Sequence, residues 1–243
     1  MKDHYSYTHY ADADVAETFD ALRFGGPVGQ YLLDCQERVL LTACSPVRGR
    51  RVLDVGTGTG RAAIGLAKAG ATVLAVDASD QMLAVARSRA ASAGVIIELS
   101  HGDAHALECA DRSVDVAVSF RVIMHTPDWQ RCIAELCRVS RWRVVVDFPA
   151  LGSVAALESA ARRLGRSLGL RTEAYRVLAE RDVERAFQAN GFRVVSVDRQ
   201  FVLPIALHKA VGSMRFTRAA EHALSAVGLL RLLGSPVTMV AER

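Results

Sequence analysis

A glycine-rich turn beyond residue 51 carries the strongest chemical signal in the chain. Residues 52–61 are Val-Leu-Asp-Val-Gly-Thr-Gly-Thr-Gly-Arg, an apolar segment that leads through three glycines into a helical pattern. Without Cβ atoms, Gly56, Gly58 and Gly60 allow a tight turn and close approach of a ligand to the backbone. Asp54 precedes them, and the G-x-G-x-G spacing differs from the G-x-G-x-x-G of dinucleotide sites. The turn therefore predicts a ligand that has a cationic amino group and no pyrophosphate.

A second acidic position follows the next apolar segment. Asp77 ends the segment 72–76, about 20 residues beyond the glycine turn, where a carboxylate accepts both hydroxyl groups of a ribose. The alternative is that Asp77 caps the helix that begins near Ser79, although Ser79 and Asp80 are able to cap it without help. We favour ribose binding because the spacing and the structural context agree.

A third motif, His101-Gly102-Asp103-Ala104, follows the third apolar segment. There the Asp103 carboxylate is placed to accept a hydrogen bond from an adenine amino group, while the backbone N–H of Ala104 reaches a ring nitrogen. An isolated Gly-Asp-Ala sequence is most often a plain turn. The prediction that this motif binds adenine therefore depends on the two motifs before it.

These positions follow the ends of predicted parallel strands. From residue 50 to about 148, short runs rich in β-branched residues alternate with helical patterns, which is typical of successive βαβ units and of a parallel sheet. The helical patterns end at Gly70 and Gly94, which suit a left-handed C-cap. Ligands bind such sheets at the carboxyl edge of the strands. The predicted strands are 51–55, 72–76, 95–99, 114–120 and 143–148, and the predicted crossover helices are 61–69 and 79–93.

The remainder of the chain is predicted to complete the sheet and to cover the ligand. A helical, arginine-rich pattern spans 149–178, and a sixth and a seventh strand are predicted at 193–197 and 237–241. The sixth strand follows a helix over 181–190, and a long helical pattern over 205–234 separates the two strands. If the seventh strand is antiparallel to the sixth, this helical insertion lies at the carboxyl edge of the sheet.

Taken together, the motifs resemble the class I S-adenosylmethionine-dependent methyltransferases, in particular the branch of quinone-biosynthesis and small-molecule methyltransferases. The resemblance covers residues 50–148 and includes the stretch 119–129, Ser-Phe-Arg-Val-Ile-Met-His-Thr-Pro-Asp-Trp. It implies S-adenosylmethionine as cofactor and S-adenosylhomocysteine as product. It also implies an α/β fold: a Rossmann-like, seven-stranded, mostly parallel sheet with the last strand antiparallel, helices on both faces and helical lid insertions.

The resemblance further implies which segments and residues hold the cofactor. We expect one methyltransferase domain over 1–243, with an N-terminal helical lid at 1–49 and a cofactor-binding core at 50–148. In the C-terminal half, 149–243, acceptor-site insertions are expected near 149–179 and 204–235. Arg23 in the lid is predicted to hold the methionine carboxylate, with an ordinary surface arginine as the alternative. The expected cofactor-binding residues are Arg23, Asp54, Gly56, Thr57, Gly58, Gly60, Asp77, Ala78, Met82, Gly102, Asp103, Ala104 and Phe120.

Methyl transfer requires little further catalytic machinery. A sulfonium methyl group is already activated, so the protein mainly places the acceptor atom in line with it and excludes water. A hydroxyl acceptor also benefits from a general base. His125, which follows the fourth predicted strand, is the first candidate, and His208 in the late insertion is the second. The alternative for His125 is that it only lines the pocket. We favour oxygen as the acceptor atom, and carbon and nitrogen remain open.

The composition argues against several other classes. The 27 arginines and 3 lysines are spread along the chain and leave a net charge of only +4, which does not predict nucleic-acid binding. All apolar runs are shorter than the roughly 18 residues of a membrane span, and the chain starts without a signal sequence, so we expect a cytoplasmic protein. Five cysteines without C-x-x-C spacing predict neither disulfides nor a metal site. A small molecule is therefore the expected substrate.

Two surface segments, one rich in leucine and alanine and one rich in arginine, each allow two interpretations. The leucine- and alanine-rich segment 219–233 predicts either a cover for the pocket or a homodimer face. A local arginine cluster predicts either a solvated helix face, which we favour, or an anion-binding surface. Its members are Arg162, Arg163, Arg166, Arg171 and Arg176.

Two alternative functions also remain. An NAD(P)-dependent oxidoreductase shares the glycine turn and the acid after the second strand, but the glycine spacing and the absence of a Tyr-x-x-x-Lys pair disfavour it. A non-catalytic module that binds S-adenosylmethionine would carry the same cofactor motifs. The sequence does not distinguish this module from an enzyme.

Overall fold

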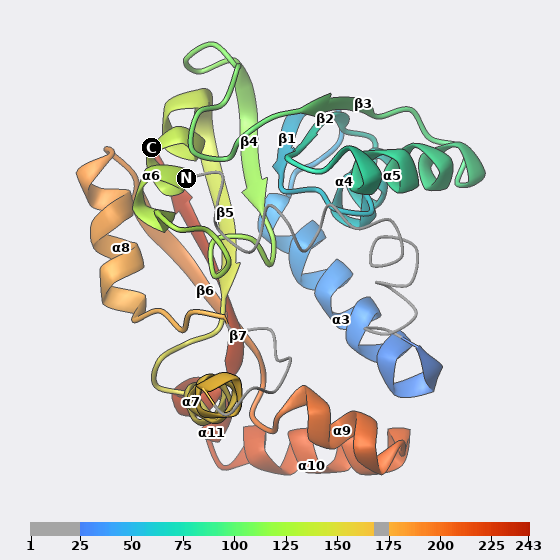
Figure 1. Cartoon of the computed structure of the whole chain (residues 1–243), viewed down its shortest axis with the longest axis vertical. Coiled ribbons are helices and arrows are strands. Elements are labelled where there is room, and N and C mark those ends of the chain that lie inside the picture. The colour runs from blue at the N-terminus through green and yellow to red at the C-terminus, as the bar shows by residue number, and fades with distance from the viewer. Residues whose placement is uncertain (1–24, 168–174) are drawn as a thin grey trace.

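Seven strands form a single sheet in the computed structural model, which describes residues 25–167 and 175–243. The strands are β1 (Arg51–Val55), β2 (Thr72–Asp77), β3 (Glu98–His101), β4 (Val114–Ser119), β5 (Ser140–Phe148), β6 (Arg193–Phe201) and β7 (Ser235–Glu242). Their order across the sheet is β3-β2-β1-β4-β5-β7-β6 (Figure 1). β7 runs antiparallel to β5 and β6, and the other paired strands are parallel. The predicted Rossmann-like α/β sheet is confirmed.

Helices cover both faces of this sheet, as the strand sequences require. The described helices are α3 (Gly26–Cys44), α4 (Arg61–Lys68), α5 (Asp80–Ser92), α6 (Trp129–Val139), α7 (Val154–Ser167), α8 (Glu180–Ala189), α9 (Ile205–Val211), α10 (Met214–Ala226) and α11 (Leu229–Leu233). In β4, Val116 and Val118 pack with residues of α3 and α4, whereas Ala117 packs with residues of α6 and α8. Apolar residues are needed on both sides because parallel strands are covered on both faces.

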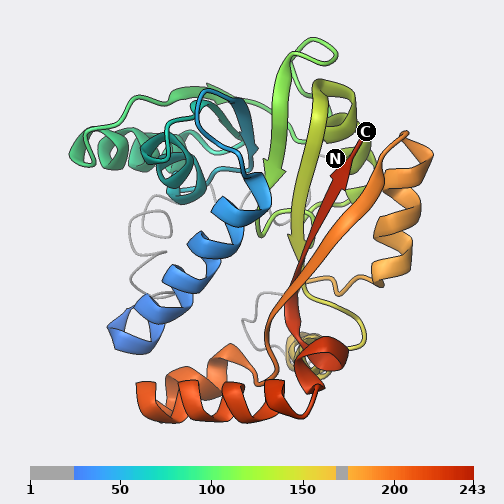
Figure 2. The same cartoon turned by 180° about the vertical axis from the view of Figure 1, so that it is seen from behind.

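The later helices gather at the carboxyl edge of the sheet. Figures 1 and 2 show α7, α9, α10 and α11 at the end of the molecule where β4 and β5 finish. This is the edge at which the helical insertion between the sixth and seventh strands was predicted to lie. The fold therefore places both predicted insertions beside the ends of the parallel strands, where ligands bind in this architecture.

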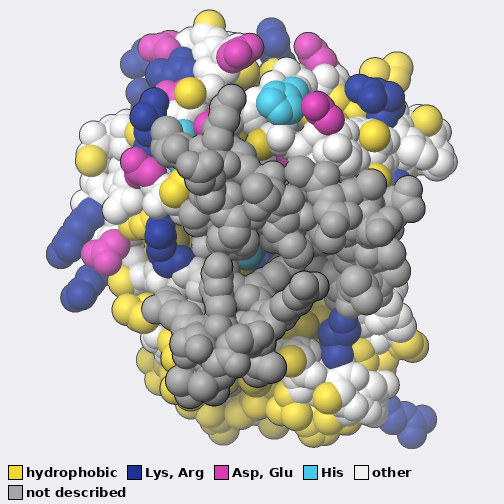
Figure 3. Space-filling model, viewed as in Figure 1, with side chains coloured by type: hydrophobic (Ala, Val, Ile, Leu, Met, Phe, Trp, Pro, Cys, Tyr) yellow, Lys and Arg dark blue, Asp and Glu magenta, His cyan; other side chains and the backbone are white. Residues whose placement is uncertain are grey.

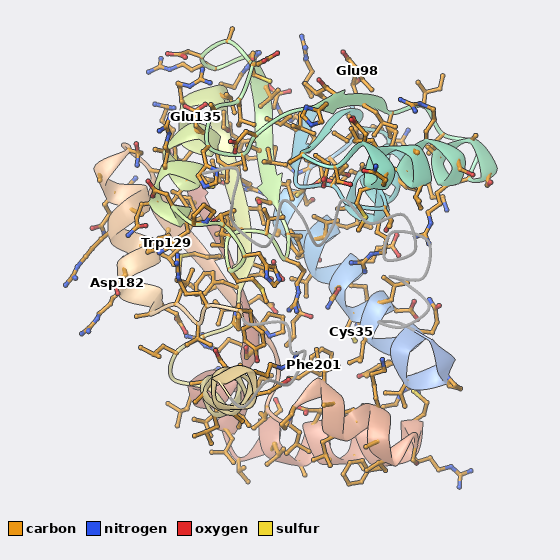
Figure 4. The ribbon with its side chains drawn as sticks, in the orientation of Figure 1. Cys35, Glu98, Trp129, Glu135, Asp182 and Phe201 are labelled. Carbon is orange, nitrogen blue, oxygen red and sulfur yellow. The ribbon has the colours of Figure 1, made fainter. Side chains whose placement is uncertain are left out.

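Helix α3 connects these later helices to the sheet. Its first half buries Val28 and Leu32 against Phe201 at the end of β6, and Figure 4 shows Phe201 at this lower end of the molecule. Its second half buries Leu40 and Cys44 in the core on the α4 face. Of the predicted lid 1–49, the structure describes only the part from residue 25, so the lid role stays a prediction.

Several local predictions differ from the structure. β5 begins at Ser140 and β6 runs to Phe201, so both are longer than predicted. β3 begins at Glu98 rather than at residue 95, because the Val95 N–H donates to the Ala90 carbonyl (3.1 Å) and closes the end of α5. Within the predicted helical pattern 149–178, Leu178 is extended: its N–H donates to the Pro149 carbonyl at 3.0 Å. The pattern over 205–234 is three helices, because Gly212 and Gly228 adopt positive φ angles of 65° and 81° between them.

One buried carboxylate anchors α10 to the end of β6. Glu221 accepts hydrogen bonds from the backbone N–H groups of Val202 (2.8 Å) and Leu203 (3.0 Å) and contacts His208 Nε2 at 2.8 Å. The Glu221 side chain is 11% exposed. Removing it leaves several buried donors without this acceptor.

We therefore expect Glu221→Ala to lower the free energy of unfolding by about 2–4 kcal/mol. Chemical denaturation followed by circular dichroism measures this change. Glu184→Ala, which removes an exposed carboxylate from α8, is the matched control and should change stability by less than about 0.5 kcal/mol. Equal stability of the two variants would show that Glu221 does not anchor the insertion.

Candidate active site

A pocket opens at the carboxyl edge of the sheet, where β1, β2, β3 and β4 end. It is lined by most of the residues singled out from the sequence: Asp54, Gly56, Thr57, Gly58, Asp77, Ala78, Met82, Gly102, Asp103, Ala104, Phe120 and His125. Gly60 and His208 do not line it within the described ranges, and Arg23 lies outside them. Residues that the sequence analysis did not select also line it, notably Arg61, His105, Arg121, Val122 and Thr126.

The glycine turn has two positions where a side chain would matter. Gly56 has φ +72°, and a Cβ there would lie 2.3 Å from Cγ2 of Val122, so a larger residue would collide with the loop after β4. Gly58 has φ +54°, and its Cβ position has no atom within 4 Å. Because Gly58 lines the pocket, its bare backbone leaves room for a ligand to approach. Gly60 instead opens α4 and packs near Ala86 of α5, where its Cβ would lie 3.0 Å from the alanine methyl.

The N–H groups of the turn are used inside the protein. Those of the first two residues donate to the carbonyl of Val76 at 2.7 and 3.0 Å. Gly58 donates to Oδ2 of Asp77 at 2.7 Å, and Gly60 donates to the carbonyl of Thr57 at 3.0 Å. In dinucleotide-binding folds such amides contact the pyrophosphate. Their engagement here disfavours a pyrophosphate ligand.

Asp77 stands at the junction of this turn with the end of β2. Its Oδ1 accepts the N–H of Ser79 at 2.9 Å, and its Oδ2 accepts the N–H of Gly58. Burial raises the pKa of Asp77, and these backbone hydrogen bonds oppose the rise. The Ser79 hydroxyl accepts the Met82 N–H at 3.1 Å, so Ser79 rather than Asp77 is the N-cap of α5. Each carboxylate oxygen of Asp77 keeps capacity to accept a further hydrogen bond from a ligand.

Asp103 is oriented by a histidine that the sequence analysis missed. Its Oδ1 accepts from the backbone N–H of His105 at 2.9 Å and lies 2.6 Å from the His105 Nδ1. On the other side of the ring, Asp128 donates its N–H to Nε2 at 3.4 Å, so the proton is assigned to Nδ1. His105 is 1% exposed, whereas the side chain of Asp103 is 38% exposed. The Asp-x-His spacing was the available signal for this contact.

Asp54 is the most deeply buried carboxylate of the pocket. It is 1% exposed, and its Oδ2 accepts a hydrogen bond from the Thr57 hydroxyl at 2.7 Å. Burial raises the pKa of Asp54 to about 6, and the charge of Asp77 adds to the rise. Arg61 begins α4 nearby, and burial lowers the pKa of its guanidinium to about 10. The Asp54 carboxyl and the Arg61 guanidinium therefore both lie in a poorly solvated part of the pocket.

The loop after β4 supplies the other wall. Arg121 has a left-handed backbone, φ 64°, and its N–H donates to Oδ1 of Asp147, a fully buried residue of β5. Four residues later, the N–H of His125 donates to the carbonyl of Val122 at 2.8 Å. His125 is 7% exposed and lines the pocket. The tight turn thus presents an arginine and a histidine to the same cavity.

His208 lies elsewhere. It is fully buried between α9 and α10, where it contacts Glu221 and lies edge-on to the Phe201 ring with a centroid distance of 6.1 Å. The structure does not bring His208 to the pocket wall, so its catalytic role stays a prediction without support from this geometry.

The chain is similar to methyltransferases in sequence and in fold. Residues 52–142 match the family described as a methyltransferase domain. Over 166 residues the chain is 31% identical to a ubiquinone biosynthesis O-methyltransferase of Sinorhizobium fredii, covering 66% of this chain and 67% of that protein. An uncharacterized protein of Mycobacterium tuberculosis is 35% identical over 120 residues, covering 47% of this chain and 44% of that protein. The match thus spans less than half the length of this mycobacterial relative.

A solved structure has a similar overall fold. The crystal structure of magnesium protoporphyrin IX methyltransferase from Synechocystis PCC 6803 with bound SAM has a TM-score of 0.63 to this chain. The comparison covers 98% of this chain and 96% of that one at 19% sequence identity. At this identity the likeness concerns the fold. Separately, none of the helices in the described part of the chain is long and apolar enough to cross a membrane.

The buried Asp54 carboxyl gives stability a predictable pH dependence. Its pKa of about 6 in the folded protein exceeds the ordinary value of 3.8, so folding favours the protonated form. The stabilisation that this provides is fully present below about pH 4 and is lost as the pH rises through about 6. Relative to Asp54→Asn, which does not titrate, wild type should lose about 2 kcal/mol of unfolding free energy between pH 4.5 and 7.

Urea denaturation of both proteins at several pH values measures this difference. Asp80→Asn, which changes an exposed carboxylate on the first turn of α5, is the control for removal of a carboxyl group. A difference between wild type and Asp54→Asn that does not vary with pH would mean that Asp54 titrates normally.

Proposed function

Because this chain belongs to the class I S-adenosylmethionine-dependent methyltransferases, we propose that it transfers the methyl group of that cofactor to a small-molecule acceptor, with oxygen as the favoured acceptor atom. The observation that carries the proposal is the set of carboxylates at or beside the ends of three successive strands. Asp54, Asp77 and Asp103 all line one pocket along the glycine turn. Such a set of carboxylates suits a ligand made of an amino acid joined to an adenosine. The amino acid offers ammonium donors, the ribose offers hydroxyl donors and the adenine offers amino donors.

The residues present fit that cofactor. Gly58 leaves open space at the pocket wall, so a ligand has room to lie against the turn. Asp77 is held by two backbone N–H groups and retains acceptor capacity for ribose hydroxyls. Asp103 is fixed by His105 and is partly exposed, as a residue that accepts from an adenine amino group must be. Met82 and Phe120 supply apolar walls.

The protein's own residues then have three tasks. When bound, the cofactor supplies an activated methyl group on a sulfonium. The carboxylates and the glycine turn bind and orient it, and the loop 120–126 together with the later helices encloses the acceptor and excludes water. His125 is our candidate to take the proton of an acceptor hydroxyl, because it lines the pocket on the turn after β4.

Several observations bear on the acceptor atom, on the acceptor class and on the alternative functions. The ubiquinone biosynthesis O-methyltransferase of Sinorhizobium fredii, 31% identical, supports oxygen as the acceptor atom and a quinone-like phenol as the acceptor class. An NAD(P)-dependent oxidoreductase is disfavoured by the internal engagement of the turn amides. A binding module without transferase activity is the remaining alternative, and an assay for S-adenosylhomocysteine release over a panel of phenols separates it from an enzyme.

A homodimer and a cytoplasmic location remain predictions. Figure 3 shows apolar side chains gathered at the lower end of the molecule, where α10 and α11 lie. Val227 and Leu232 there are 72% and 74% exposed. Such a surface supports self-association of the segment that the sequence analysis proposed as a dimer face.

Cofactor binding tests the proposal directly. We expect Asp77→Asn to weaken S-adenosylhomocysteine binding by about 10- to 100-fold, because charge-assisted hydrogen bonds to the ribose contribute about 1.5–3 kcal/mol. Isothermal titration calorimetry measures the change, with circular dichroism to check the fold. Asp80→Asn, three residues further along, should bind as wild type does. Wild-type protein that binds neither S-adenosylmethionine nor S-adenosylhomocysteine would refute the proposed function.

A base role for His125 makes a separate prediction. His125→Gln should lower kcat by about 100-fold or more with a phenolic acceptor, while the affinity for S-adenosylhomocysteine changes less than twofold. The acidic limb of the pH profile of kcat should also disappear, since no imidazole remains to be protonated. The measurement is the rate of S-adenosylhomocysteine release at saturating acceptor between pH 5.5 and 9. Unchanged kcat in the variant would leave His125 as a lining residue only.

A further inference from the structure

Arg121 has an unusual backbone for an arginine in the wall of the pocket. It lies two residues after the end of β4 and has φ 64°, a left-handed conformation that residues other than glycine rarely adopt. Its N–H donates to the carboxylate of the buried Asp147. Among the described residues, Arg112 is the other non-glycine residue with positive φ, and it lies on an exposed turn. Strain of this kind beside a cavity is a reason to look for a ligand contact.

The guanidinium of Arg121 has unused hydrogen-bonding capacity. Its Nε is buried and has no hydrogen-bond partner, and no ion pair joins its side chain to a carboxylate in residues 25–167 or 175–243. Asp147 contacts the Arg121 backbone rather than its side chain. A buried donor without an acceptor destabilises the protein, because it has lost its hydrogen bonds to water. A pocket ligand that supplies an anionic acceptor would remove this destabilisation.

The charge of Arg121 acts on one residue beside the glycine turn and on one residue of the segment after α7. Burial lowers the pKa of Arg61, at the start of α4, and the positive charge of Arg121 lowers it further. Burial raises the pKa of Tyr175 to about 12, and the charge of Arg121 opposes that rise. Arg121 is thus close enough to both residues to act on them. Arg61 follows the glycine turn, and Tyr175 lies in the segment after α7, where the acceptor is expected.

We propose that Arg121 binds a carboxylate group of the acceptor, so that the substrate of this protein is an anionic small molecule. This inference rests on the proposed methyl transfer and narrows its substrate class. The planar guanidinium offers a pair of parallel N–H donors that match the two oxygens of a carboxylate. His125 lies on the same turn, so an acceptor held at its carboxylate by Arg121 presents its remaining atoms to the pocket beside the candidate base.

Matched pairs of small acids and amides test the proposal. The probes are 4-hydroxybenzoate with 4-hydroxybenzamide, and 3,4-dihydroxybenzoate with 3,4-dihydroxybenzamide, titrated calorimetrically into protein saturated with S-adenosylhomocysteine. We expect each acid to bind wild type about tenfold or more tightly than its amide, as a bidentate charged contact would give. Arg121→Gln should abolish this preference by weakening acid binding alone, and Arg121→Lys should restore part of it.

The control variant is Arg112→Gln. It removes an exposed arginine that also has a left-handed backbone, so it reproduces the loss of charge and the local backbone change away from the pocket. It should keep the wild-type preference for acids. Thermal unfolding of each variant checks that the fold is intact.

Three results would overturn the proposal. Equal binding of acids and amides by wild type, including no binding of either, would exclude a carboxylate site of this kind. An acid preference that persists in Arg121→Gln would assign the site to other residues. Weaker S-adenosylhomocysteine binding by Arg121→Gln, by a factor similar to the loss of acid binding, would show that Arg121 holds the cofactor's carboxylate instead.

Failure of the proposed function gives a different result. A wild-type protein without affinity for S-adenosylhomocysteine would refute methyl transfer, while the acid and amide titrations, repeated without that ligand, would still decide whether Arg121 binds carboxylates. The two proposals are therefore tested independently.

Discussion

The hydrogen bond from the Gly58 N–H to the Asp77 carboxylate joins the turn after β1 to the end of β2. It fixes the glycine turn against the neighbouring strand and turns its amide groups inward. The same carboxylate accepts the N–H of Ser79 at the start of α5. One side chain thereby sets the relative position of a turn, a strand end and a helix, and the pocket that they enclose depends on it.

This arrangement concentrates charge where water is scarce. Burial raises the pKa of Asp54 and lowers that of Arg61, so both groups are held at a cost to their ionised forms. Only a well-packed scaffold maintains such a site. The apolar cores on the two faces of the sheet, with Leu53 and Val144 in one and Val52 and Val145 in the other, supply that support. Adjacent residues of a strand thus stabilise opposite faces of the sheet.

The pocket wall after β4 depends on segments that are distant in sequence. The loop after β4 carries Arg121 and His125, and the N–H of Arg176 donates to the carbonyl of Met124 in that loop at 3.0 Å. Asp147 of β5 accepts the Arg121 N–H. The loop after β4 is therefore held in place by β5 and by the segment after α7.

Much of the fold was predictable from local patterns. The β1 strand 51–55 was predicted at its observed bounds, and the helices after Gly60 and near Ser79 were located correctly, because apolar periodicity and glycine C-caps act over a few residues. The boundary of β3 was wrong because Val95 completes the preceding helix. Helix α6 was not predicted, although Asp128 caps it and its apolar residues recur at helical spacing.

The sequence by itself determined the sheet class, the glycine turn and the acids that follow successive strands, because each depends on local order along the chain. Only the tertiary structure showed that His105 orients Asp103, that His208 is buried away from the pocket, and that Arg121 lines the pocket with a buried Nε that has no hydrogen-bond partner. These relations depend on which segments meet at the carboxyl edge. Packing across the whole sheet decides which segments come into contact, and a local sequence pattern does not contain this information.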